Sequence, residues 1–311
     1  MNTYENNGEG SNINQYNEGI NLLDFFFILW KRKLLIISFT ITAAISSVFF
    51  AVSLPNIYTS SALLTPSNPQ DSLSSQLQGF SAIAGLAGVS MPQDAGNSST
   101  EAMARIKSFS FFSSHFLPQI KPEDLVASVE WVPESNTILY DKNIYNKKNK
   151  TWVNNPLQKS LPSTQVAFKK YKSILDINID AKTSFVTISI DHPSPIIAKE
   201  WVEIIVSSIN NLMKHEAMKA AENSISFLED TYKSTNNQSL RDGISSLIES
   251  QIKTLMLASS DDDYIYKILD SPIVPEKKSA PGRALLCILG TLLGGLLGVI
   301  LTLFLHFFRR D

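Results

Sequence analysis

The sequence predicts an α+β membrane protein in which two transmembrane helices flank one large domain outside the membrane. Leu34 to Leu54 and Ala284 to Phe308 contain no charged residue. Each stretch is long enough to cross a hydrocarbon core of ~30 Å, which takes ~20 helical residues. The region between them, 55–283, combines alternating strand patterns with a long helical pattern. These observations define a two-span protein with a mixed domain between the spans.

The orientation follows from the charges beside the first span. Lys31, Arg32 and Lys33 precede this span, and the next basic residue after it is Arg105. The positive-inside rule therefore places the N-terminus in the cytoplasm, and the second span returns the tail at 309–311 to the same side. A cleaved signal peptide is the alternative, and its typical apolar region of only ~7–15 residues argues against it.

Two different segments precede the first span. Residues 1–19 are rich in Asn, Glu and Gly, which predicts a disordered cytoplasmic tail. Residues 20–33 are more apolar, with Asn21 as a plausible helix N-cap and Trp30 near the span. This pattern predicts a short helix in the membrane interface.

A long helix is expected at about 194–235. Ser194 can cap it, Pro195 suits its first turn, and no further Pro or Gly occurs before about Tyr232. The apolar residues keep spacings of three and four, which indicates one narrow stripe. A second helix is expected at about 239–259. A small base domain cannot bury a stripe of this length alone, so we expect a homo-oligomer.

Shorter elements are expected on both sides of the long helix. Alternating apolar residues predict a hairpin whose strands are Lys172–Asp180 and Ser184–Asp191. The other expected elements are a helix over Glu101–Leu117, a short helix within 156–168, and a strand over Tyr264–Leu269. Pro272, Pro275 and Pro281 then predict a stiff, extended segment before the second span.

The second span carries a packing motif. Gly290, Gly294 and Gly298 form two overlapping GxxxG steps. Small residues at this spacing allow two helices to approach closely in lipid. Glycine is also common in apolar spans for flexibility alone, and this second interpretation stays open.

No pattern indicates catalysis or cofactor binding. The chain lacks a GxxxxGK[ST] phosphate loop, its one cysteine, Cys287, lies in the second span, and Asp261–Asp263 lacks the spacing of a calcium loop. The net charge of −2 offers no basic field for nucleic acid. We therefore predict no catalytic, cofactor-binding or metal site. None of the histidines has a second ligand nearby: His115, His192, His215 and His306.

Several segments resemble the Wzz-type polysaccharide chain-length determinants. The likeness covers both ends of the chain and the order of the elements, and it is weak over 66–170. The segments that carry it are Ile20-Asn-Leu-Leu-Asp, Leu29-Trp-Lys-Arg-Lys, Pro55-Asn-Ile-Tyr-Thr-Ser-Ser-Ala, Asp191-His-Pro-Ser-Pro-Ile-Ile-Ala and Tyr264-Ile-Tyr-Lys-Ile-Leu-Asp-Ser-Pro-Ile-Val-Pro-Glu-Lys.

The resemblance implies a bell-shaped homo-oligomer in the bacterial inner membrane, with an α/β base and a long helix projecting into the periplasm. It implies a non-enzymatic co-polymerase that regulates the modal length of lipopolysaccharide O-antigen or a related surface polysaccharide. Its partners would be membrane lipid, the polymerase and the undecaprenyl-linked glycan.

Three alternatives remain at this stage. The related tyrosine autokinases of capsule or exopolysaccharide export carry a kinase domain, which we do not expect in a chain that ends at Asp311. A two-span membrane sensor would need a cytoplasmic output module. A membrane-anchored hydrolase would need a buried acid–base pair, and the sequence indicates none.

Overall fold

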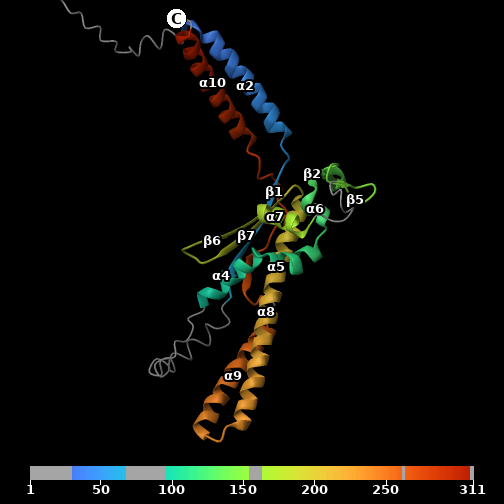
Figure 1. The fold of residues 1–311 in the computed structure, drawn as a ribbon, viewed down its shortest axis with the longest axis vertical. Coiled ribbons are helices and arrows are strands. Elements are labelled where there is room, and N and C mark those ends of the chain that lie inside the picture. The colour runs from blue at the N-terminus through green and yellow to red at the C-terminus, as the bar shows by residue number, and fades with distance from the viewer. Residues whose placement is uncertain (1–29, 68–94, 154–162, 261–262, 309–311) are drawn as a thin grey trace, which may run out of the picture. The chain divides into compact units, whose positions relative to one another are not determined.

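The computed structural model describes residues 30–67, 95–153, 163–260 and 263–308 (Figure 1). The chain divides into two compact units. One unit joins Met1–Leu54 to Gly282–Asp311, and the other is Pro55–Pro281. The expected tail at 1–19 and most of the expected interfacial helix lie outside the described residues.

The first unit is a pair of apolar helices in contact with each other. These helices are α2 (Lys33–Ser53) and α10 (Arg283–Phe307), and each begins one residue before the uncharged stretch that predicted it. Both are long and apolar enough to cross a membrane. Large apolar side chains on their outer faces are exposed, as lipid-facing residues would be: Ile45, Phe49, Leu285, Leu292 and Leu296.

The second unit is built on a four-stranded antiparallel sheet. Its strand order is β6-β7-β1-β8. The hairpin expected from the sequence is present, with Leu175 paired to Ile190 and Ile179 paired to Val186. The strands are β1 (Tyr58–Pro66), β6 (Leu175–Ile179), β7 (Val186–His192) and β8 (Tyr266–Asp270).

The chain leaves the sheet along its longest helix and returns along a second helix. α8 (Pro195–Ser234) begins at Ser194, whose hydroxyl accepts a hydrogen bond from the Ile197 N–H. α9 (Gln238–Ser260) packs along the far half of α8, and Figure 1 shows the two helices side by side. At the turn between them, Arg241 Nε donates to the Thr235 carbonyl at 2.7 Å.

The sequence predicted one narrow apolar stripe on the long helix that other subunits would cover. The hairpin of α8 and α9 differs from this expectation. The first half of α8 packs against β1 and β7, and there it buries a face wider than a stripe. The second half packs against α9, so Ala221 and Ala258 are buried. Much of the stripe is therefore buried within the chain itself.

The core lies between the sheet and α8. Alternate residues of β1 and β7 are buried, as the two-residue period of a strand requires. Val202 and Ile205 of α8 are buried in the same cluster. The buried members contributed by the two strands are Ala62, Leu64, Val186, Ile188 and Ile190.

The helical segment expected over Glu101–Leu117 is present, but it is divided near Ser108 and does not form one continuous helix. The Ser108 hydroxyl accepts a hydrogen bond from the Phe111 N–H at 3.1 Å, so a new helix starts where the pattern appeared continuous. The segment comprises α4 (Ala95–Ile106), α5 (Phe109–Phe111), the π-helical turn η1 (Phe112–Phe116) and the 3-10 turn η2 (Leu117–Gln119).

The strand expected from Lys172 begins later, because a helix occupies its first residues. α7 (Thr164–Ile174) carries Tyr171 into the core, where its hydroxyl donates to the Ile106 carbonyl at 3.0 Å. The Phe168 ring meets the Phe109 ring edge-on at 5.3 Å. These contacts keep the backbone helical up to Ile174. Residues 154–162, which include the first part of the region 156–168 where a short helix was expected, lie outside the described residues.

The remaining elements include two small hairpins, the first of which lies beside the start of β1. The Trp131 ring meets the Tyr58 ring at 5.8 Å, which places the first hairpin there. The elements are α6 (Pro122–Val126), β2 (Ser128–Val132), the 3-10 turn η3 (Pro133–Ser135), β3 (Thr137–Tyr140), β4 (Tyr145–Asn146) and β5 (Thr151–Trp152).

Candidate functional site

The histidines and acidic residues form no metal centre in the described part of the chain. No group of three or more His, Cys, Asp or Glu side chains there could hold a metal ion. His115 stacks on Phe111 and His215 is exposed. The side chain of His306 and residues 261–262 lie outside the described residues.

The glycine face of α10 lies against α2 of the same chain. A Cβ added at Gly294 would lie 2.2 Å from the Ala43 Cβ, and one at Gly290 would lie 2.5 Å from the Ser47 Cβ. At Gly298 the nearest atoms, 3.4 Å away, are the Ile36 Cα and the Phe39 Cβ. A side chain at either of the first two positions would force the helices apart, which is why glycine suits this contact.

Two buried or partly buried hydroxyls of the helix pair are hydrogen-bonded. The Ser47 hydroxyl donates to the Leu286 carbonyl across the interface at 3.0 Å. The Thr302 hydroxyl is fully buried and donates to the Gly298 carbonyl at 2.7 Å. These bonds remove the cost of leaving hydroxyls unpaired in an apolar surrounding.

The proline segment after β8 runs alongside the start of β1. Pro272 is buried, and Pro275 and Pro281 are half-buried. The Ile57 N–H donates to the Ala280 carbonyl at 2.9 Å, so the entry and exit of the Pro55–Pro281 unit are tied together. A functional role for the three prolines stays a prediction.

The basic residues that predicted the orientation lie at the start of α2. Lys31 and Lys33 are exposed and Arg32 is half-buried. The Lys33 Nζ lies 4.8 Å from the centroid of the Trp30 ring, which is a cation–π contact. Their role in orienting the chain stays a prediction.

His192 is a buried structural residue at the junction of β7 and α8. Its Nδ1 accepts from the Ser194 N–H at 2.9 Å, and its Nε2 lies 3.0 Å from the Asp124 carbonyl. This geometry needs the neutral ring with its proton on Nε2. Burial lowers the pKa of His192 to about 4, although both backbone hydrogen bonds oppose the shift.

Stability should therefore decrease in mild acid. An unfolded histidine takes up a proton near pH 6.5, whereas folded His192 resists until about pH 4. The free energy of unfolding should fall by about 3 kcal/mol as the pH drops through this window. Urea unfolding of the purified protein at several pH values measures the effect. His192→Gln should flatten the dependence and the exposed control His215→Gln should not; equal slopes in both variants would contradict the assignment.

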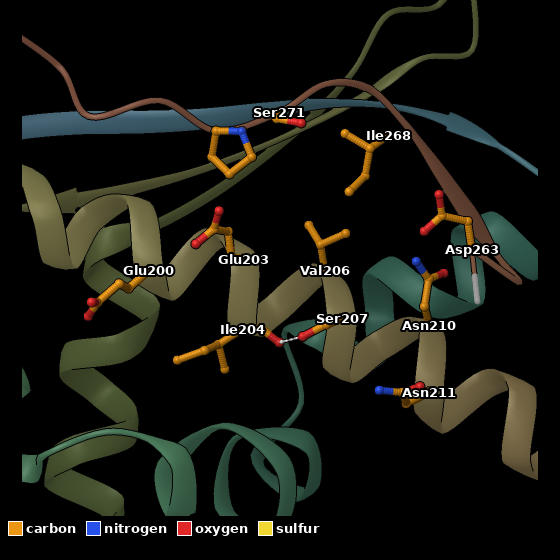
Figure 2. Close-up of a pocket in the computed structure, with 11 residues that line it drawn as sticks. Glu200, Glu203, Ile204, Val206, Ser207, Asn210, Asn211, Asp263, Ile268 and Ser271 are labelled. Carbon is orange, nitrogen blue, oxygen red and sulfur yellow. Dashed lines mark hydrogen bonds between the residues drawn. The ribbon is translucent and has the colours of Figure 1, made fainter.

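A cavity of about 720 Å³ lies between α8 and the segment from Asp263 to Pro272. Figure 2 shows the side chains of Glu200 and Glu203 toward one end and those of Asp263 and Asn210 beside each other toward the other end. Carboxylates, amides and apolar side chains thus share one lining. The cavity combines hydrogen-bonding groups with apolar contacts, as small-molecule sites commonly do.

Asn210 lines this cavity, and its hydrogen bonds stabilise the fold. Its Nδ2 donates to the Tyr266 carbonyl at 2.9 Å, and its Oδ1 accepts from the N–H groups of Ile265 and Tyr266. The side chain is only 2% exposed. No sequence motif marks this residue. The available signal was its position on the same helical face as the buried Val206 and Met213.

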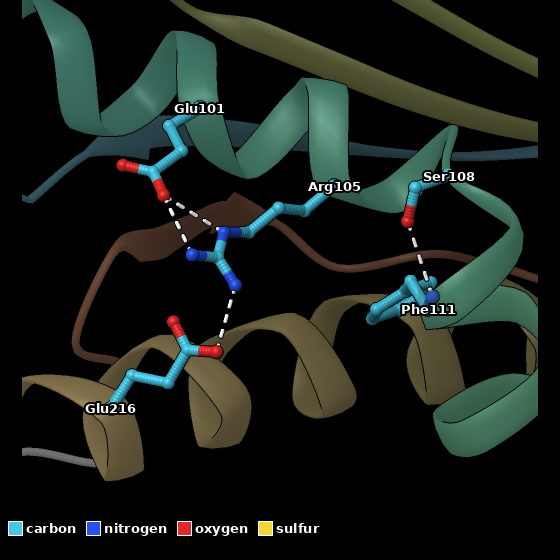
Figure 3. A network of polar contacts seen from close by, with 5 residues as sticks. All are labelled: Glu101, Arg105, Ser108, Phe111 and Glu216. Atoms are coloured by element: carbon cyan, nitrogen blue, oxygen red, sulfur yellow. Dashed lines mark hydrogen bonds and ion pairs between the residues drawn. The ribbon is translucent and has the colours of Figure 1, made fainter. Parts of the chain in front are cut away.

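An ion-paired network ties α4 to α8 at the far side of the core. Arg105 Nη2 lies 2.7 Å from Glu101 on its own helix, and Nη1 lies 2.8 Å from Glu216 on α8 (Figure 3). The hydrogen bond to Glu101 contributes most to raising the pKa of Arg105. These side chains are partly exposed, so the network positions α4 more than it stabilises the fold.

The comparison with protein families gives the first evidence of relationship. Residues 18–107 match the Wzz family, described as chain length determinant protein. These residues are of the Wzz type. The resemblance seen in the sequence is thereby confirmed, over less than a third of the chain. A comparison with curated proteins finds no match.

Two solved structures are similar to this chain. One is a "full-length bacterial polysaccharide co-polymerase", with 15% identity, 93% of this chain and 99% of that chain covered, and a TM-score of 0.40. The other is a fragment of WzzB, a polysaccharide co-polymerase from Salmonella Typhimurium, with 15% identity, 72% and 100% coverage, and a TM-score of 0.28. At these TM-scores the likeness is too low to support a conclusion about this chain. The α+β fold class follows from its own helices and strands.

Proposed function

We propose that this protein regulates the modal chain length of a bacterial surface polysaccharide, either lipopolysaccharide O-antigen or a related glycan. It acts as a non-enzymatic scaffold beside the polymerase that extends an undecaprenyl-linked chain. The observation that carries the proposal is the match of residues 18–107 to the chain length determinant family. Two apolar helices, which precede and follow the Pro55–Pro281 unit in the sequence, also support the proposal.

The proposed mechanism is biased binding. A scaffold changes the length at which a polymerase stops only if it binds one state of the polymerase or glycan better than another. A tenfold preference corresponds to about 1.4 kcal/mol, which a few hydrogen bonds supply. The protein then needs no catalytic group of its own.

Deleting the gene should change the distribution of glycan lengths without abolishing glycan synthesis. A regulator that biases the polymerase alters where chains end, whereas an enzyme of the pathway would alter whether chains form. Gel electrophoresis of lipopolysaccharide from wild-type, deletion and complemented cells measures the distribution. An unchanged ladder after deletion would refute the proposal, and so would the loss of all polymer.

We propose a two-span topology in the bacterial inner membrane, with both termini cytoplasmic and the Pro55–Pro281 unit periplasmic. Lys31, Arg32 and Lys33 support it, because they precede an exit that carries no basic residue before Arg105. Alkaline phosphatase is active only in the periplasm. A fusion after Asp311 should be inactive, and one that replaces everything after Asn236 should be active. The reverse pattern would invert the topology.

We also propose that the working form is a homo-oligomer. Apolar side chains on the α8–α9 hairpin remain exposed after the two helices have packed, which favours contacts between copies. Cross-linking in native membranes tests this assembly, and a uniformly monomeric protein would exclude it. The side chains are Phe227 at 71% exposure, Leu240 at 59%, Leu247 at 52% and Met256 at 64%.

A further inference from the structure

We infer that a groove across α8 binds a segment of the glycan, as a hydroxyl-rich oligosaccharide. The inference rests on the proposed function for the identity of the ligand. The site itself is drawn from the shape and chemistry of the Pro55–Pro281 unit. We call it the α8 groove and define it as the two cavities that share Glu200 and Ile204.

The two cavities adjoin along α8. The first, of about 720 Å³, lies toward β8, and the second, of about 430 Å³, lies toward the β2–β3 hairpin. Glu200 and Ile204 line both, so the two cavities border each other at these side chains. Each part alone falls within the size range of ligand pockets, which is about 300–1,000 Å³. Their sum suits an extended chain of rings better than a single small molecule.

The groove offers both donors and acceptors. Carboxylates of Glu200 and Glu203 lie in the first part, and Lys121, Lys147 and Asn136 contribute donors to the second. A sugar hydroxyl donates one hydrogen bond and accepts others, so its recognition requires groups of both kinds. The mixture matches a polyhydroxylated ligand.

Glu200 is the group best placed to contact the ligand. It is exposed at the junction of the two cavities, and its carboxylate has no hydrogen bond or ion pair to the described residues. Glu203, one turn further, pairs with Lys199 at 3.0 Å. Glu200 therefore keeps its acceptor capacity for hydroxyls, and Figure 2 shows its side chain at the end of the first cavity.

Apolar side chains between the polar groups complete the site. Ile204 and Ile268 line the first cavity together with Pro272, and the Tyr140 ring lines the second. The C–H faces of sugar rings pack against surfaces of this kind, while the hydroxyls reach the polar groups. The lining alternates in the way that such a ligand requires.

The charges argue against other ligand classes. The lining contains both carboxylates and lysines, whereas phosphate-rich ligands require a positive field. A protein partner would require a contiguous apolar centre depleted of charge. A neighbouring copy of this chain is the competing occupant. Glycan binding and cross-linking of the same variants distinguish it from the glycan.

The test measures binding of the full-length protein in detergent to lipid-free oligosaccharides cut from the surface polysaccharide of the same bacterium. Saturation-transfer NMR reports the bound sugars, and dextran of similar size serves as the unrelated glycan. Glu200→Ala removes the central acceptor, and Ser207→Trp fills the first cavity from an exposed position. Glu222→Ala, exposed on α8 outside the groove, is the matched control.

We expect saturable binding that weakens at least tenfold in Glu200→Ala and Ser207→Trp and stays unchanged in Glu222→Ala. The modal length should shift in the same two variants. Wild-type affinity in both groove variants overturns the inference, as does a complete lack of binding. A changed cross-linking pattern in Ser207→Trp with normal glycan binding also overturns it, because the groove is then a contact between copies. If deletion of the gene leaves the ladder unchanged, the proposed function is wrong. The binding measurement still shows in that case whether the α8 groove binds the oligosaccharide.

Discussion

Replacing Gly294 by leucine should force α2 and α10 apart and broaden or shift the modal length of the glycan. Even one added carbon would lie 2.2 Å from the Ala43 Cβ, and real Cβ atoms essentially never approach so closely. Both positions lie on helix backbones, so relief requires a helix to move rather than a side chain to rotate. Overpacking of this kind costs about 1–3 kcal/mol or more. Insertion into the membrane should persist, because leucine is more apolar than glycine.

The neighbouring glycine provides the matched control. A Cβ at Gly295 would meet only the Thr40 Oγ1 at 3.6 Å, an ordinary contact. Gly295→Ala should therefore leave the glycan ladder and the thermal midpoint of the purified protein unchanged, whereas Gly294→Ala should lower that midpoint. If Gly294→Leu leaves the ladder unchanged and deletion of the gene alters it, the helix pair is only an anchor and the Pro55–Pro281 unit alone sets the length.

Replacing Asn210 by leucine should destabilise the Pro55–Pro281 unit by about 3–5 kcal/mol. Leucine has nearly the same size but cannot form hydrogen bonds. The N–H groups of Ile265 and Tyr266 would lose their acceptor, and the Tyr266 carbonyl would lose its donor. Each unpaired buried group costs about 1–3 kcal/mol. The loss should detach β8 from α8, which would also open the larger cavity of the α8 groove.

Urea unfolding of the purified protein measures this loss, and the next residue is the control. Asn211 is exposed, so Asn211→Leu should change the free energy of unfolding by no more than about 0.5 kcal/mol. Similar losses in the two variants would show that the buried bonds of Asn210 contribute little. The contrast is informative because the two residues have the same chemistry and differ only in the face of α8 on which they lie.

The sequence by itself determined the parts of this protein that depend on local composition. The two apolar helices begin within one residue of the uncharged stretches. Charged residues are costly in hydrocarbon, so their positions mark where a membrane-spanning stretch can begin and end. The long helix begins at Pro195, as its cap and proline predicted. The β6–β7 hairpin follows from the two-residue alternation that places every second side chain in the core.

Only the tertiary structure decided which partner each pattern meets. The glycine motif of α10 had several possible partners, and the contacts assign its face to α2 of the same chain. The stripe of α8 was expected to need other subunits, but the sheet and α9 bury much of it. Periodicity identifies an apolar face, but it carries no information about what covers that face.

The α8 groove was also beyond the reach of sequence patterns. Glu200 is unremarkable on a helix until Tyr140 and Ile268, which lie far from it in the chain, line the same groove. Asn210 and Asn211 are likewise adjacent and chemically identical, and only the pairing of Asn210 with Tyr266 makes it structural. Contacts between residues more than fifty positions apart depend on how the elements pack, and local sequence does not encode that arrangement.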